Sequence, residues 1–349
     1  MYLARRDALI KIGVGAVAGA ALSAGNVLQS FGASNIQTDR INEYSWVRGF
    51  NYQPSWGCNG IQIWNDFRES TFAHEVDLGL RLFPKLNVLR IWFSFDAHIS
   101  NRLKFLASAK QAAAILSGRN IKMIPVIFNN WHSLVDFGGF SIEQLNASRG
   151  NNNYGAHRQY LRELVEAILP ANNLLMYDMA NEPFNNGGLA EITLDFLKSM
   201  SMELKKTDTK TPVSIGTQGI FGGEDLNAID SIVDVHAIHP YWCKDWCSQA
   251  ENVERFAKLI NQLKKLGKPV IATECCWGSN DDAIRVKYIR NDLDLLKQAG
   301  IGFLTHGLHH SFVADLHRPI SGRNWDTMYM GFIEPNGLIR SGHEIFNEY

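Results

Sequence analysis

The sequence predicts an α/β protein in which eight βα units close into a single (β/α)8 barrel. Short apolar segments alternate with longer amphipathic ones, there are eight short segments, and no change of composition divides the chain after residue 46. The short segments are apolar throughout, as in parallel strands that are buried on both faces. The predicted strands are residues 47–52, 87–93, 122–128, 174–179, 212–217, 232–238, 269–273 and 302–306.

Helical patterns fill the spaces between these strands. From Phe72 to Phe83, for example, apolar residues recur every three to four positions, the spacing of one helix face. Residues 218–231 leave room for only a short helix. Gly118, Gly267 and Gly300 follow three of the helices, where C-terminal caps are expected. The predicted helices are residues 71–83, 101–116, 157–169, 189–206, 252–266 and 282–298.

A doubly wound open sheet is the alternative arrangement of such units. It usually carries a phosphate-binding loop such as GxGxxG after the first strand. Here the first strand leads into QPSWG at residues 53–57. We therefore expect one closed TIM barrel over residues 46–349.

The composition is that of an ordinary globular protein, with 349 residues, 46% hydrophobic and 20% charged. The net charge of −1 provides no basic surface of the kind that binds nucleic acid or an anionic membrane. We expect neither as a partner.

The N-terminus predicts an export signal over residues 1–24. Arg5 and Arg6 precede an apolar, glycine- and alanine-rich stretch and then small residues, a pattern that resembles a twin-arginine signal. A membrane anchor is the alternative, although the apolar run is short for a spanning helix. Residues 25–45 form a polar lead-in. We expect an exported protein, periplasmic or extracellular, with no stable membrane insertion once the signal is removed.

The five cysteines cannot all pair within one chain. If the protein is exported, Cys243 with Cys247 is the natural candidate for a disulfide. No cysteine or histidine spacing typical of a zinc site is present, so we expect no metal. The C-terminal histidines lack a carboxylate at ligand spacing; they are His306, His309, His310 and His317.

Polar or aromatic groups stand at nearly every predicted strand end. In such a barrel, active sites lie at the carboxyl ends of the strands, so these side chains should share one face. In strand order they are Asn51, Arg90, Asn129 with Asn130, Trp131 and His132, Asn181 with Glu182, His239 with Tyr241 and Trp242, Glu274, and His306.

Glu182 and Glu274 are the candidate catalytic residues. A pair of carboxyl groups separated by about 5 Å supports retaining cleavage of a glycosidic bond, and a gap of ~6.5–9.5 Å supports inversion. Glu182 would be the acid/base and Glu274 the nucleophile. Arg90 would keep Glu274 ionised, Tyr241 would orient it, and Asn181 would bind the sugar 2-hydroxyl.

These residues also allow structural interpretations. Glu182 could interact with a helix N-terminus, Arg90 could be a core ion-pair partner, and Asn181 could be a turn residue. His132 and His239, which would line the subsite, could instead be packing residues. The two glutamates at strand ends favour the catalytic interpretation.

The motifs at the strand ends resemble those of clan A glycoside hydrolases, most closely family 5, the endoglucanase and mannanase family. They are RGFNY, VLRIW, NNWH, NEP, HPYW and ATE, in chain order. The resemblance implies a (β/α)8 barrel, a retaining mechanism and no cofactor. It also implies acid/base Glu182 and nucleophile Glu274, with the supporting residues Arg90, His132, Asn181, His239 and Tyr241.

The chain departs from that family at the eighth strand, where His306 stands in place of the usual tryptophan platform for a sugar. Trp277 or Trp325 could replace the platform.

The favoured hypothesis is a retaining β-glycoside hydrolase that cleaves β-linked glucan or mannan, acting as a monomer on an oligosaccharide or polysaccharide. An exo-acting β-glucosidase or β-mannosidase is one alternative, and a barrel that binds carbohydrate without cleaving it is another. A metal-dependent amidohydrolase would need an HxH pair at the first strand, and the sequence has none there.

Overall fold

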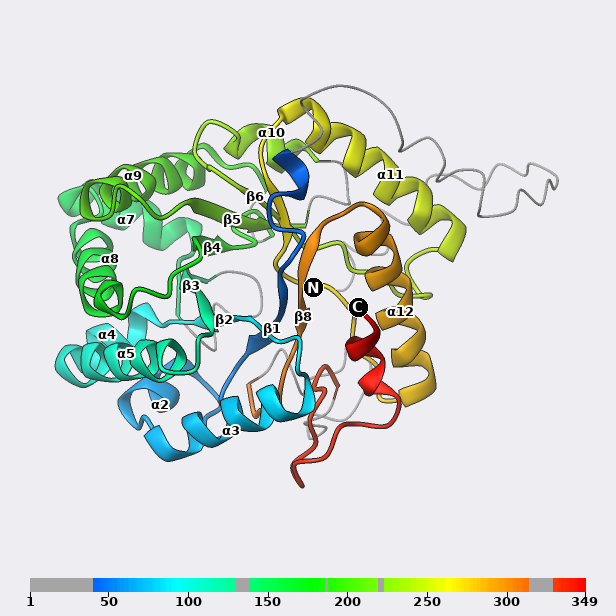
Figure 1. The fold of residues 1–349 in the computed structure, drawn as a ribbon. Coiled ribbons are helices and arrows are strands. Elements are labelled where there is room, and N and C mark those ends of the chain that lie inside the picture. The colour runs from blue at the N-terminus through cyan, green and yellow to red at the C-terminus, as the bar shows by residue number, and fades with distance from the viewer. Residues whose placement is uncertain (1–39, 130–137, 186–187, 219–222, 314–328) are drawn as a thin grey trace. The chain divides into compact units, whose positions relative to one another are not determined.

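The computed structural model describes residues 40–129, 138–185, 188–218, 223–313 and 329–349. Eight parallel strands form a closed barrel in chain order, and β8 pairs with β1 to complete it (Figure 1). The predicted fold class is therefore confirmed. The strands are β1 (Arg48–Tyr52), β2 (Val88–Trp92), β3 (Lys122–Phe128), β4 (Tyr177–Asn181), β5 (Val213–Thr217), β6 (His236–Ile238), β7 (Val270–Ala272) and β8 (Gly302–His306).

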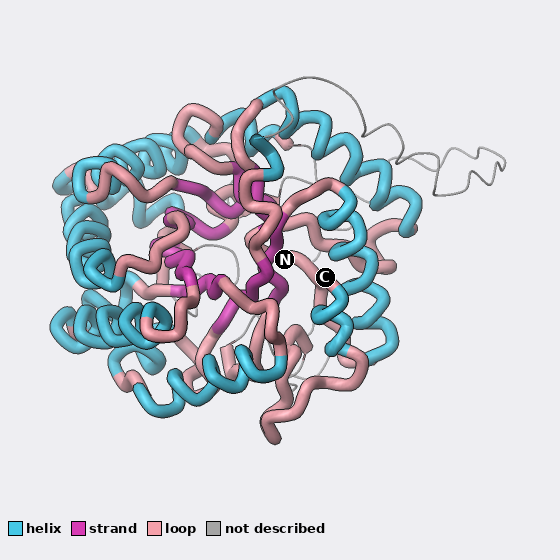
Figure 2. Tube along the Cα trace, viewed as in Figure 1, coloured by secondary structure: helices cyan, strands magenta, loops and turns pink. Residues whose placement is uncertain are grey.

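Helices surround the strands, as Figure 2 shows in cyan around magenta. All six predicted helices are present, and a short helix occupies the interval between β5 and β6. The helices are α2 (Gly60–Asn65), α3 (Glu69–Leu82), α4 (Phe95–Ser100), α5 (Arg102–Ser117), α7 (Ile142–Asn152), α8 (Gly155–Ile168), α9 (Glu191–Thr207), α10 (Glu224–Ile229), α11 (Gln249–Leu266) and α12 (Asp282–Gln298), with 3-10 turns η2 (Arg40–Asn42), η3 (Leu169–Ala171) and η4 (His343–Glu348).

Three helices were not predicted, because their sequences show little apolar periodicity. Helices α2 and α4 have six residues each, and α7 buries only Leu145. Each begins at a side chain that accepts a hydrogen bond from a backbone N–H two or three positions on, a cap that stabilises a short helix. These caps are Asn59, Ser94 and Ser141.

The glycine caps are only partly as predicted. Gly267 and Gly300 adopt the left-handed conformation, with φ of 72° and 69°. Gly118 remains right-handed at φ −62°, and Asn120 makes the left-handed turn instead, with φ of 57°. Asparagine tolerates this region better than most residues, so it can take the place of glycine.

Strand β4 starts three residues later than predicted. Leu174 only forms an isolated bridge to Met123, and the regular strand begins at Tyr177. The pairing of β4 with β5 is irregular between Asp178 and Asn181. As a result Asn181 ends the strand, and Glu182 follows it directly.

The barrel interior is apolar toward the amino ends of the strands and polar toward their carboxyl ends. Val88, Ile124, Met176, Ile271 and Leu304 belong to one buried apolar cluster. Two positions further along β2 and β4 lie Arg90 and Asp178, both fully buried. Since residues two apart on a strand share a face, the apolar cluster supports a polar layer above it.

All five cysteines lie within the described residues, and all are free thiols. The candidate disulfide between Cys243 and Cys247 is therefore absent. In the part of the chain that the structure describes, no helix combines the length and hydropathy needed to cross a membrane. The predicted export signal of residues 1–24 lies outside that part, as does most of the lead-in.

Candidate active site

Arg90 on β2 is the centre of the polar layer. Its Nε donates to Asp178 Oδ2 at 2.9 Å, and its Nη2 lies 2.7 Å from the same oxygen. Nη1 donates to Asn51 Oδ1 at 2.7 Å and to Glu274 Oε1, and Nη2 donates to Asn181 Oδ1 at 2.8 Å. Burial by itself would lower the pKa of Arg90, but the two carboxylates raise it above its ordinary value. The guanidinium is thus a fixed positive charge with four partners, which come from β1, from β4 and from the segment after β7.

Glu274 follows β7 and is held by three elements. Besides Arg90, the Tyr241 hydroxyl donates to Oε2 at 2.8 Å, and the Nδ1 atom of His306 lies 3.6 Å from the same oxygen. Burial alone would raise the pKa of Glu274, but the His239 imidazole and the Arg90 guanidinium hold it well below its ordinary value. Burial and the Glu274 carboxylate raise the pKa of Tyr241 well above its ordinary value, which keeps the phenol a donor.

Glu182 extends from the end of β4 in an uncommon backbone conformation. Its φ is 43°, in the left-handed region, and its N–H donates to Gly216 O at 2.9 Å. Such strain persists where surrounding contacts enforce it, often at functional sites. Oε1 lies 2.8 Å from His239 Nδ1, while Oε2 accepts from Asn185 Nδ2 and, at 3.5 Å, from Gln218 Nε2.

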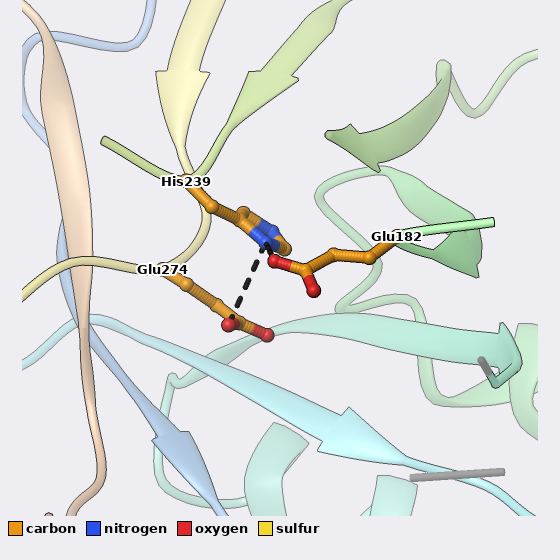
Figure 3. Close-up of side chains that lie close together, drawn as sticks. All are labelled: Glu182, His239 and Glu274. Atoms are coloured by element: carbon orange, nitrogen blue, oxygen red, sulfur yellow. Dashed lines mark hydrogen bonds and ion pairs between the residues drawn. The ribbon is translucent and has the colours of Figure 1, made fainter. Parts of the chain in front are cut away.

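His239 lies between the two glutamates (Figure 3). Its Nδ1 is 2.8 Å from Glu182 Oε1 and 3.5 Å from Glu274 Oε2, and its Nε2 is 3.0 Å from Thr273 Oγ1. One oxygen of each glutamate and one ring nitrogen all lie within 4.8 Å of one another. Both carboxyl groups are almost fully buried. Two carboxyl groups this close can act together on one bond of a substrate, one as a proton donor and the other as an ionised group.

The same three groups have a spacing that could hold a metal ion. A divalent cation there would meet the Arg90 guanidinium, which is already bonded to Glu274. Charge repulsion at so short a distance opposes such an ion. The residues present therefore fit an ion pair better than a metal, and the expectation of a metal-free site stays a prediction.

Arg285 on α12 hydrogen-bonds the backbone of the loops around Glu274. Its side chain is fully buried, and Nη1 donates to the carbonyls of Cys276 and Trp277, directly after Glu274. Nη2 donates to the carbonyl of His306 at 2.7 Å and to that of Met330 at 3.0 Å. Burial lowers the pKa of Arg285 to about 10. The Arg285 guanidinium thus connects three parts of the chain, namely the loop after β7, the end of β8 and the segment around Met330.

The structure brings most of the predicted site residues together. Trp277 contacts Tyr241: the two rings meet edge-to-face, with 5.3 Å between their centroids. His132 and Trp325 lie outside the described residues. The residues gathered around the two glutamates are Arg90, Asn181, His239, Tyr241 and His306.

Sequence reasoning missed several residues of the site. Asp178 had a signal, because a carboxylate inside an apolar strand needs a charged partner. Thr273 had none, since its partner His239 comes from another βα unit, and Asn185, three positions after Glu182, resembled an ordinary loop residue. Arg285 resembled any polar position on an amphipathic helix.

Two buried, closely spaced carboxyl groups at the strand ends of a (β/α)8 barrel are the arrangement that glycoside hydrolases use, and this chain has both features. It belongs to the cellulase family, glycosyl hydrolase family 5, whose family model matches residues 80–309.

Relatives with curated descriptions are mannanases, and the matches to them are partial. The chain is 33% identical over 115 residues to a probable mannan endo-1,4-β-mannosidase A of Aspergillus clavatus, covering 31% of each protein. It is 27% identical over 174 residues to a mannan endo-1,4-β-mannosidase A of Hypocrea jecorina, covering 44% of this chain and 39% of that one. The matches thus span well under half of the relatives' lengths.

Solved structures share the fold at low identity. An exo-β-1,4-mannosidase from an Opitutaceae bacterium superposes with a TM-score of 0.67 and 17% identity, over 86% of this chain and 58% of that one. An endo-1,4-β-D-mannanase from Thermotoga petrophila gives a TM-score of 0.57 and 19% identity, over 87% of this chain and 98% of that one.

Proposed function

We propose that the protein is a retaining β-glycoside hydrolase that cleaves β-1,4-linked mannan, with β-glucan as the second substrate. The observation that carries the proposal is the separation of at most 4.8 Å between oxygens of Glu182 and Glu274. Retaining enzymes keep their carboxyl groups about 5 Å apart, whereas inverting ones leave room for a water molecule. The names of the curated relatives favour mannan, and the family as a whole includes cellulases.

In the first step, a Glu274 oxygen attacks the anomeric carbon while Glu182 gives its proton to the glycosidic oxygen. The bond from carbon to leaving oxygen breaks, and a glycosyl ester of Glu274 forms. In the second step Glu182 removes a proton from water, the water oxygen attacks the same carbon, and Glu274 leaves as a carboxylate. Two inversions give net retention.

The surrounding residues suit these roles. Arg90 and Tyr241 stabilise the ionised form of Glu274, which is needed for attack and again on departure. The Asn181 oxygen is occupied by Arg90, which leaves the amide nitrogen to donate to the sugar 2-hydroxyl.

The experiment compares Glu182→Gln and Glu274→Gln with a buried control, Glu203→Gln on α9, which pairs with Arg162. We expect each active-site variant to lose at least ~100-fold in kcat on mannan, and the control to keep its activity. NMR of the first product should show the β-anomer. Near-normal turnover in either active-site variant, or an initial α-product, would overturn the proposal.

Azide, as an added nucleophile, distinguishes the acid/base from the catalytic nucleophile. With Glu182→Ala and an aryl β-mannoside, azide should release the β-mannosyl azide from the glycosyl ester. With Glu274→Ala it should attack the anomeric carbon directly and give the α-azide. The opposite assignment of products would show that the two glutamates have exchanged roles.

A further inference from the structure

His306 is a buried polar side chain whose ring has no hydrogen-bond partner among the described residues. The side chain is 3% exposed, and neither ring nitrogen makes a hydrogen bond within that part of the chain, although Nδ1 lies within ion-pair distance of Glu274 Oε2, at 3.6 Å. A buried polar group in that state is costly to the folded protein. Where such a group persists beside reacting residues, a ligand is the natural missing partner.

The ring lies next to the site of reaction and its backbone is fixed there. Nδ1 is 3.6 Å from Glu274 Oε2, and the ring meets Trp92 edge-on at 6.3 Å between centroids. The His306 N–H donates to Cys275 O at 3.2 Å, and its carbonyl accepts from Arg285. A sugar whose anomeric carbon contacts Glu274 would therefore be within reach of this imidazole.

A second buried polar group stands close by in the barrel. The side chain of Gln53 is 1% exposed, and neither its amide oxygen nor its amide nitrogen has a partner in the described part of the chain. Gln53 follows β1, and β1 pairs with β8 so that Asn51 is opposite His306. Two unsatisfied polar side chains thus follow neighbouring strands at the carboxyl end of the barrel.

The charge around His306 indicates a neutral ligand. Glu274 lies against the ring, and Glu182 lies across His239 from Glu274. The guanidinium of Arg90 is bonded to Glu274 and Asp178, and that of Arg285 to backbone carbonyls that include the one of His306. A sugar with its own carboxylate would place a further negative charge beside Glu274, where both guanidinium groups are already bonded to other partners. A hydroxyl both donates and accepts a hydrogen bond, so it can pair with either ring nitrogen of an imidazole.

We propose that His306 is a specificity-determining residue that hydrogen-bonds a ring hydroxyl of the neutral sugar held against Glu274. The inference rests on the proposed function. An imidazole offers a smaller apolar face than an indole, so at this position recognition depends on the direction of a hydroxyl more than on stacking.

The test pairs His306 variants with substrates that lack one hydroxyl. The kcat/KM of the wild-type protein, His306→Phe and His306→Gln is measured on aryl β-mannosides with hydrogen in place of the hydroxyl at C2, C3 or C6. At one position we expect the wild-type protein to lose roughly 10-fold or more and His306→Phe to lose little further. His306→Gln, which keeps a donor and an acceptor, should recover part of the dependence. Equal losses in the wild-type protein and His306→Phe at all three positions would overturn the inference.

The control is His157→Phe, a buried histidine whose ring stacks on Phe95 at 4.5 Å, away from the glutamates. Its response to the missing hydroxyls should equal that of the wild-type protein. A change as large as in His306→Phe would mean that loss of any buried histidine alters the profile, and would count against His306.

A binding measurement distinguishes failure of this inference from failure of the proposed function. Mannotetraose is titrated by calorimetry into Glu182→Gln with and without His306→Phe, and a weakening of roughly 10-fold is expected. If the wild-type protein hydrolyses no β-glycoside but this loss appears, the proposed function fails and the role of His306 stands. If hydrolysis needs both glutamates but binding is unchanged, the role of His306 fails alone. Tighter binding of a uronic-acid oligosaccharide that depends on His306 would overturn the choice of a neutral sugar.

Discussion

At the scale of single residues, the site depends on the Arg90 guanidinium, which bonds several side chains at once. Arg90 hydrogen-bonds Asn51, Asp178, Asn181 and Glu274, so it fixes positions as well as charge. Removing either partner of a buried pair is far more damaging than weakening an exposed one, because the remaining charge is left in a poorly solvated place. Together with the His239 imidazole, the Arg90 guanidinium holds the pKa of Glu274 well below its ordinary value.

Tyr241→Phe should change how activity depends on pH. The hydroxyl donates to Glu274 Oε2 and so favours the ionised carboxylate; without it, the pKa of Glu274 moves up toward its ordinary value. Activity that needs ionised Glu274 is lost as pH falls, so the acid limb of kcat/KM should shift to higher pH. The control is Tyr177→Phe, whose hydroxyl bonds Asp208 instead. An acid limb at the same pH in Tyr241→Phe as in the wild-type protein would refute the role.

At the scale of elements, the strands were predictable and the loops between them were not. The continuous apolar runs located β3 and β8 at their observed limits, because burial on both faces requires that composition. The start of β4 was misplaced, since Leu174 to Met176 are as apolar as a strand and nothing local shows where pairing becomes regular. The two glutamates could be found because a charge at the end of a buried strand is anomalous. The contact of Glu182 with His239, and that of His239 with Thr273, join different βα units, so they depend on tertiary structure and leave no local pattern in the sequence.

Arg285→Lys should impair catalysis by loosening the loops that carry Glu274 and His306. A lysine amine cannot span the separate carbonyls that the planar guanidinium reaches. We expect kcat to fall roughly 10-fold or more with a smaller change in KM, measured on mannan. The control is Arg48→Lys, an arginine that also donates to backbone carbonyls but at the start of β1. An equal fall of kcat in both variants would indicate general destabilisation instead.

Asp292 on α12 should make stability depend on pH. Its side chain accepts from the Cys276 N–H at 2.8 Å, and burial raises the pKa of Asp292 to about 7. The folded protein then retains a proton that the unfolded chain loses near pH 4, so stability falls as pH rises from about 4 to about 7 and is level above. This contribution is of the order of 4 kcal/mol.

Asp292→Asn removes that titration and can still accept the Cys276 hydrogen bond. Urea unfolding between pH 4 and 8 should show the variant gaining stability relative to the wild-type protein as pH rises. Val286→Ala, which removes no titratable group from the same helix, is the control, and its difference from the wild-type protein should stay constant. A constant difference for Asp292→Asn as well would contradict the raised pKa.

At the scale of the whole molecule, the last residues of the chain complete the fold. Phe346 in η4 is fully buried, and its ring lies 4.4 Å from that of Phe50 on β1 and 5.4 Å from that of Phe83 after α3. The C-terminus therefore covers the outside of the first βα unit. The packing of η4 against the first βα unit could not be predicted from the sequence, because η4 has no strong apolar periodicity of its own.

Phe346→Ala should destabilise the protein by about 3–5 kcal/mol, through lost burial and the cavity that remains. Urea unfolding measures the change, and activity in the absence of urea should be nearly normal because the site lies elsewhere. Leu338→Ala, at a position that is 63% exposed, is the control and should change stability by less than about 0.5 kcal/mol. A loss below 1 kcal/mol for Phe346→Ala would mean that the C-terminal turn is not part of the cooperative core.

The partners of Arg90 have a consequence for biosynthesis. Asn51, Asp178 and Glu274 reach the same guanidinium from segments separated by more than half of the chain. A ribosome that has released only the first six strands has therefore produced neither the complete ion-pair network nor the second glutamate. The two proposed catalytic groups therefore come together only in a late event, when the seventh and eighth strands join the first. A nascent or truncated polypeptide that ends before residue 274 accordingly lacks the proposed nucleophile.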